Sequence, residues 1–151
     1  MKKISLLGST GSIGVNTLDV VERNPESFQV LAMSAGSNVD LFAEQVRKFK
    51  PKVASLFDTK KIATLKERVA DLDVEIIPGE EGSIAVATLS EADVVVSGVV
   101  GSAGLVPAME ALRAGKNLAL ANKETLVIAG ELVLKEAEKT NSQIIPIDSE
   151  H

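Results

Sequence analysis

The sequence contains no cysteine, no tryptophan and no tyrosine, and its single histidine is the last residue, His151. Without cysteine the chain has no disulfide, no thiolate zinc site, no iron–sulfur cluster and no cysteine nucleophile. A single histidine also excludes a histidine-rich metal site within this chain. The four phenylalanines are the only aromatic residues. We therefore expect no nucleic-acid surface built on base stacking.

An excess of positive charge and long apolar runs are also missing. Sixteen Lys and Arg stand against 21 Asp and Glu, which leaves a net charge of −5, and this balance argues against binding a nucleic-acid backbone. No segment reaches the roughly 18 consecutive apolar residues of a membrane helix, so we expect no membrane partner. The apolar run after the N-terminus stops at Gly8, which is too short for a signal peptide. The sequence therefore predicts a cytoplasmic protein.

Short β-rich runs alternate with helical patterns along all 151 residues, and 45% of the residues are hydrophobic. We expect strands at residues 4–7, 28–33, 53–57, 74–77, 93–96, 117–120 and 143–147. We expect helices over residues 12–23, 80–89 and 124–139. Three further helices are expected: one that begins at Asn38, one that begins at Asp58 and one that includes Pro107. This alternation predicts an α/β fold of the Rossmann-like, doubly wound kind, with a mainly parallel sheet and helices on both faces.

Two glycine triplets share the spacing G-x-x-G-x-x-G, and each follows an expected strand: Gly8, Gly11 and Gly14, and Gly98, Gly101 and Gly104. The carboxyl ends of parallel strands are where ligands bind in such folds. Glycine permits a tight turn, close approach of the backbone to a phosphate, and close packing of helix on strand. The amides of residues 10–13 are therefore candidates for binding a dinucleotide pyrophosphate, aided by the helix dipole. A tight strand–helix turn without a ligand is the alternative.

The end of the second expected strand should select the cofactor. An acidic residue there would bind the ribose 2′-hydroxyl of NAD, but residues 34–38 read SAGSN and the first acid is Asp40. A carboxylate would repel a 2′-phosphate, so its absence favours NADP. No Lys or Arg stands in this stretch, and Ser37 and Asn38 offer hydrogen bonds only. Asn38 is equally well explained as a helix cap.

Two polar clusters follow expected strands near the C-terminus of the sequence. Asp148 and Glu150 are two residues apart, so on an extended chain their carboxylates lie on one side and can share Mg²⁺ or Mn²⁺. A solvated turn explains the same residues. The second cluster consists of Asn122, Lys123 and Glu124. Its lysine is a candidate for binding an anionic substrate, and its glutamate is a candidate for binding the nicotinamide ribose. Ordinary helix capping is the alternative for this second cluster.

Four motifs occur in a fixed order along the chain: LGSTGSIG (residues 7–14), VGSAGL (100–105), LANKETL (120–126) and PIDSEH (146–151). Together they resemble the 1-deoxy-D-xylulose 5-phosphate reductoisomerase family, and the resemblance covers the chain from end to end. It implies an NADPH-dependent, divalent-metal-dependent oxidoreductase and isomerase. Such an enzyme converts 1-deoxy-D-xylulose 5-phosphate to 2-C-methyl-D-erythritol 4-phosphate in the non-mevalonate isoprenoid pathway.

The resemblance also implies a role for each matching residue. The cofactor pyrophosphate would be held by the first glycine loop, through Gly8, Thr10, Gly11, Ser12 and Ile13. The adenosine ribose phosphate would lie among Gly36, Ser37 and Asn38, and NADPH would also contact Asn122 and Glu124. Metal ligands would be Asp148 and Glu150. The phosphorylated sugar substrate would contact Lys123, Ser149, Glu150 and His151, with Lys123 and Glu150 as catalytic residues.

The sequence departs from the family in two respects. Many members carry a basic residue where this chain has Ser37, which weakens the expected 2′-phosphate site. Members are also much longer, so we expect residues 1–151 to be the NADPH-binding domain of a longer chain, inactive by itself, with the catalytic and C-terminal helical domains absent. The family suggests a homodimer for the full-length protein. A non-catalytic nucleotide-sensing module and a different NAD(P)-dependent dehydrogenase are the alternatives, and the latter would not explain both polar clusters.

Overall fold

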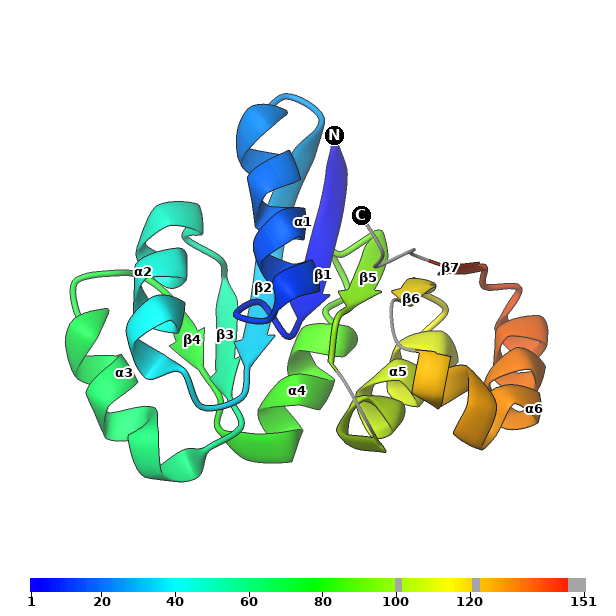
Figure 1. The fold of residues 1–151 in the computed structure, drawn as a ribbon. Helices are drawn as coiled ribbons and strands as arrows, with labels where there is room; N and C mark the ends of the chain where they lie inside the picture. The colour runs from blue at the N-terminus through cyan, green and yellow to red at the C-terminus, as the bar shows by residue number, and fades with distance from the viewer. Residues whose placement is uncertain (100–101, 121–122, 147–151) are drawn as a thin grey trace.

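The computed structural model describes residues 1–99, 102–120 and 123–146, in which strands and helices alternate as expected (Figure 1). The elements are β1 (Lys2–Leu7), α1 (Ser12–Arg23), β2 (Phe28–Ala35), α2 (Val39–Phe49), β3 (Val53–Leu56), the 3-10 helix η1 (Thr59–Lys61), α3 (Ile62–Arg68), β4 (Glu75–Ile76), α4 (Gly79–Ala87), β5 (Val94–Ser97), η2 (Ser102–Gly104), α5 (Leu105–Arg113), β6 (Asn117–Leu120), α6 (Lys123–Thr140) and β7 (Ile144–Pro146).

All seven strands form one sheet in the order β4-β3-β2-β1-β5-β6-β7. Every neighbouring pair is parallel. The chain begins in the middle of the sheet, runs outward to β4, and then returns to β5 on the other side of β1. This reversal opens a crevice between β1 and β5 at the carboxyl edge of the sheet, which is where ligands bind in doubly wound folds. The predicted fold class is therefore confirmed.

Helices cover both faces of the sheet, so the molecule has two apolar cores. One core lies under α1, α2 and α3 and includes Leu18, Phe42 and Leu65. The other lies under α4, α5 and α6 and includes Val86 and Leu112. Figure 1 shows these two groups of helices on the two sides of the central strands. Within the described ranges, no helix has the length and apolar character needed to cross a bilayer.

The helix expected over residues 80–89 is present as α4, although its apolar pattern is weak. Its close contact with the sheet depends on glycine at position 82, because a Cβ there would lie 1.9 Å from the Ile77 carbonyl oxygen and 2.0 Å from Ser55 Oγ. The Ser55 hydroxyl also donates to the carbonyl of Gly79, at 3.4 Å. The α4 backbone therefore packs directly on small residues of the sheet, and a wide apolar stripe is not required.

One expected helix begins at a later residue in the structure than the sequence predicts. The sequence predicts a single helix from Asp58, but Asp58 caps the 3-10 helix η1, with its Oδ1 accepting from the Lys60 amide at 3.1 Å. The α-helix α3 begins only at Ile62 and ends at Arg68, so Val69 lies just beyond it. The 3-10 turn comes first because the aspartate cap satisfies the tight turn locally. It places two lysines next to the carboxyl edge of the sheet.

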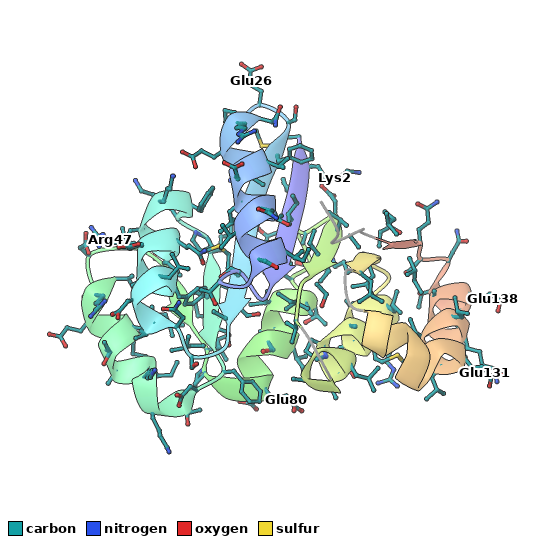
Figure 2. All side chains as sticks on the ribbon, viewed as in Figure 1. Lys2, Glu26, Arg47, Glu80, Glu131 and Glu138 are labelled. Carbon is teal, nitrogen blue, oxygen red and sulfur yellow. The ribbon has the colours of Figure 1, made fainter. Side chains whose placement is uncertain are left out.

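The two edges of the sheet are well separated. Figure 2 shows Glu26, in the turn between α1 and β2, at one end of the molecule, and Glu80, in the first turn of α4, at the other. Glu80 marks the carboxyl edge, where the loops after β1, β2, β3 and β5 come together. That edge contains the candidate site.

Candidate functional site

A cleft of about 270 Å³ lies at the carboxyl edge, at the point where the strand order reverses. Residues from the ends of β1, β2, β3 and β5 and from the starts of α4 and α5 line it, and most of them are small or apolar. They are Leu7, Gly8, Thr10, Gly11, Ser34, Ala35, Gly36, Phe57, Ser83, Gly98, Val99, Ala103 and Pro107. The cleft therefore brings together residues of both glycine loops and of the loop after β2 at the carboxyl edge of the sheet.

Three glycines around the cleft have either a backbone conformation that favours glycine or little room for a side chain. Gly8 has a φ of +80°, and its amide donates to the Ser34 carbonyl at 2.9 Å. A Cβ on Gly14 would lie 2.1 Å from the Gly8 carbonyl oxygen, and a Cβ on Gly98 would lie 3.0 Å from Ile13 Cβ. The two glycine loops thus pack on each other, although they are far apart in the sequence.

Two other glycines line the same cleft without any such requirement. Neither Gly11 nor Gly36 has a positive φ. Among the described residues, a Cβ on Gly11 would have a single neighbour within 4 Å, the Gly8 carbonyl oxygen at 3.7 Å, and a Cβ on Gly36 would have none. Side chains would fit at both positions in the protein alone. Their absence leaves space for a ligand to approach the backbone, which is the use of glycine that a phosphate site needs.

The amides that follow Gly11 belong to the first turn of α1. Gly11 is the N-cap and has no side chain with which to cap the helix, and the first turn contains no acidic residue. The first helical hydrogen bond runs from the Val15 amide to the Gly11 carbonyl, at 2.9 Å. The amides of Ser12 and Ile13 precede that bond and have no carbonyl partner within the helix. Such amides at the positive end of a helix form a binding site for an anion.

A polar pair that the sequence did not reveal holds the first glycine loop in place. Ser9 is buried, its hydroxyl donates to Gln45 Oε1 at 2.7 Å, and Gln45 Nε2 donates back to the Ser9 carbonyl at 2.9 Å. Gln45 lies on the buried face of α2. A glutamine among apolar residues on that face was the only available signal, and it does not identify its partner.

Replacing Gln45 with methionine is expected to destabilise the protein. Met has a similar volume but leaves the buried Ser9 hydroxyl and carbonyl without partners, at a cost of about 2 kcal/mol. Urea unfolding would measure the change in free energy. The exposed Gln29→Met substitution on β2 is the control and should have little effect. Equal stability of Gln45→Met and the parent chain would contradict a role for this pair.

The loop after β2 is held from two sides. Asn38 Oδ1 accepts from the Leu41 amide at 3.3 Å, which confirms Asn38 as the cap of α2. The amides of Phe57 and Asp58 donate to the carbonyls of Ala35 and Gly36, both at 2.9 Å. The segment after β3 therefore lies alongside this loop. The binding roles of Gly36, Ser37 and Asn38 stay predictions.

Ion pairs connect α2 with α3 and with the turn that follows α3, and Figure 2 labels Arg47, which lies in the last turn of α2. Two guanidinium nitrogens of Arg47 donate to Asp71, at 2.7 and 3.0 Å, and these hydrogen bonds lower the pKa of the Asp71 carboxyl. Arg68 pairs with Asp40. Asp40 is the first acid after β2, and Arg68 is the cation that balances its charge.

The second half of the predicted site lies largely outside the described residues. This applies to Asn122, Asp148, Ser149, Glu150, His151 and Gly101 of the second glycine loop. Lys123 and Glu124 belong to the first turn of α6, as expected for a helix that follows β6. Within the ranges that the structure covers, no group of three or more His, Asp or Glu side chains could hold a metal ion. The predicted metal and substrate sites therefore stay predictions.

Comparison with known proteins identifies the family. The family model for 1-deoxy-D-xylulose 5-phosphate reductoisomerase matches residues 4–130. The chain is 50% identical to the enzyme of that name from Desulfitobacterium hafniense (strain DSM 10664 / DCB-2) over 151 residues, covering 100% of this chain and 40% of the relative.

Similar solved structures belong to the same family. The reductoisomerase from Zymomonas mobilis in complex with NADPH is 38% identical, with a TM-score of 0.93, and the match covers 99% of this chain and 39% of that one. A crystal structure of DOX-P reductoisomerase with NADPH, fosmidomycin and magnesium is 40% identical, with a TM-score of 0.94, over 100% of this chain and 37% of that one. The chain thus spans about 40% of the length of its matched relatives, and over that length it belongs to the 1-deoxy-D-xylulose 5-phosphate reductoisomerase family.

Proposed function

We propose that this chain binds NADPH as the cofactor-binding part of an enzyme that converts 1-deoxy-D-xylulose 5-phosphate to 2-C-methyl-D-erythritol 4-phosphate. The observation that carries the proposal is the pair Gly11 and Gly36, which line the cleft at the strand reversal although the fold does not require glycine at either position. Family membership supports the same conclusion, since matched structures contain NADPH.

In this proposal the first glycine loop binds the pyrophosphate through the amides of residues 10–13. Gly36, Ser37 and Asn38 hold the adenosine ribose. NADPH held there would supply the hydride for reduction of the aldehyde formed by rearrangement of the substrate. The polar side chains of Asn122 and Glu124 contact the cofactor.

The substrate half of the site is proposed to begin at the other carboxyl-edge loops. Lys123 binds the anionic substrate and, with Glu150, takes part in catalysis, while Ser149 and His151 contact the substrate. Asp148 and Glu150 bind Mg²⁺ or Mn²⁺, the hard cations that prefer carboxylate oxygens. A bound divalent cation would polarise the substrate carbonyl. Two carboxylates rarely complete such a site, so we propose that residues 1–151 form the NADPH-binding domain and that turnover requires further residues.

The full-length protein is also proposed to be a homodimer in the cytoplasm. The sequence has no cysteine, which is compatible with a reducing compartment. Sedimentation of the full-length protein would measure its oligomeric state.

The central test is a fluorescence titration of the 151-residue chain with NADPH and with NADH. We expect NADPH to bind more tightly, because no carboxylate follows β2 at the position that would select a 2′-hydroxyl. Tighter binding of NADH, or no binding of either cofactor, would contradict the proposed function. Turnover of 1-deoxy-D-xylulose 5-phosphate by this chain alone would instead contradict the domain assignment.

A further inference from the structure

The loop after β2 contains no cation of its own, but a lysine from another element reaches it. Lys61 lies at the end of η1, 24 residues from Ser37, and its Nζ donates to the Ser37 carbonyl at 3.0 Å. Lys61 is exposed. The sequence does not predict this contact, because it depends on the pairing of β2 with β3.

Lys61 is placed there by the backbone and not by a chance contact of a long side chain. β3 pairs in parallel with β2, and beyond the paired residues the amides of Phe57 and Asp58 continue to donate to the β2 side, to Ala35 and Gly36, both at 2.9 Å. Asp58 then caps η1 through the Lys60 amide. The 3-10 turn therefore holds the start of the Lys61 side chain beside the loop of residues 36–38.

The Lys61 ammonium also has capacity for a further acceptor. A lysine ammonium carries three N–H donors, and one is used by the Ser37 carbonyl. Within the described part of the chain, no carboxylate forms an ion pair with Lys61. The nearby acid Asp40 pairs with Arg68 instead. A positive charge is thus available at the loop that is expected to hold the adenosine ribose.

We propose that Lys61 is a specificity-determining residue that binds the 2′-phosphate of NADPH from the segment after β3. The inference rests on the proposed function and deepens it by assigning the choice between NADPH and NADH to this side chain. A phosphate dianion attracts a lysine ammonium as a point charge, whereas the neutral 2′-hydroxyl of NADH gains little from it.

The test compares Lys61→Gln with Lys60→Gln in titrations of the 151-residue chain with NADPH and with NADH. Lys60 is also exposed, lies in the same turn, and its loss changes the net charge equally. We expect Lys61→Gln to weaken NADPH binding by about tenfold, as one charge-assisted contact is lost, and to leave NADH binding unchanged. The NADPH affinity of Lys61→Gln should also depend less steeply on salt, because a screened charge pair has been removed. Lys60→Gln should retain the parent preference.

A second variant separates a charge effect from a purely structural one. In the Lys61→Gln background, Ser37→Arg should restore the preference for NADPH, because it returns a cation to the same loop. Equal weakening of NADPH and NADH by Lys61→Gln would show that Lys61 only supports the loop, and an unchanged NADPH affinity would show that it has no role; either result overturns the proposal. If the parent chain binds neither cofactor, the proposed function itself is contradicted. If the parent chain prefers NADPH and Lys61→Gln does not change that preference, only the role of Lys61 is contradicted. The two failures are therefore distinguishable.

Discussion

The Gly14→Ala substitution is expected to lower the free energy of unfolding by about 3 kcal/mol, the upper end of the usual cost of overpacking a core. Gly14 lies in the first turns of α1, where alanine would normally gain up to about 1 kcal/mol from its helix propensity. The new Cβ, however, would lie 2.1 Å from the Gly8 carbonyl oxygen and 2.5 Å from Ser9 Cα. Both neighbours are backbone atoms that cannot rotate away, so the steric cost outweighs the gain.

Thermal and urea unfolding would measure this effect, and the melting temperature should fall by about 10 °C. The control is Asn16→Ala, which lies on the exposed side of the same helix and should be neutral or slightly stabilising. An increase in stability for Gly14→Ala would show that α1 can move away from β1 without cost.

Gly11→Val should have the opposite profile, with little change in stability and a large loss of cofactor binding. Among the described residues other than its two chain neighbours, the Gly8 carbonyl oxygen at 3.7 Å is the only atom within 4 Å of a Cβ at this position. We expect the free energy of unfolding to change by about 1 kcal/mol or less, the cost of replacing glycine at an N-cap. The valine side chain would occupy the space next to the first-turn amides and block the pyrophosphate. Loss of two charge-assisted hydrogen bonds would weaken NADPH binding by about 100-fold or more.

A titration with NADPH, combined with a melting curve of the same sample, would test both halves of this expectation. Val15→Ala, at an exposed position of α1, serves as the control and should retain both affinity and stability. Unchanged NADPH affinity in Gly11→Val would show that the pyrophosphate binds elsewhere. A large loss of stability would show that Gly11 is required for folding, as Gly14 is.

The first glycine loop could be predicted from the sequence because all of its determinants are local. A β-rich run, three spaced glycines and an amphipathic helix follow one another directly in the chain, and the same holds for the Asn38 cap of α2. The extra 3-10 turn at Asp58 was missed, since an aspartate cap precedes both kinds of helix. Glycine identity alone also did not show that Gly14 serves packing while Gly11 leaves space.

Contacts between distant segments could not be predicted in the same way. Ser9 and Gln45 are 36 residues apart, and each is unremarkable in its own segment. Lys61 and Ser37 meet only because β3 pairs beside β2. Such pairs depend on strand order and register, which hydrophobic periodicity does not specify.

The sequence by itself determined the fold class, the family and the two glycine loops, because local patterning and contiguous motifs encode them. Only the tertiary structure decided what stands around those loops. It placed β5 next to β1, so that both loops form one cleft, and it brought Gln45 and Lys61 to positions that no local pattern indicates. The physical reason is that a parallel sheet aligns the carboxyl ends of strands that are remote in the chain, and the contacts made there exist only once the strands have paired.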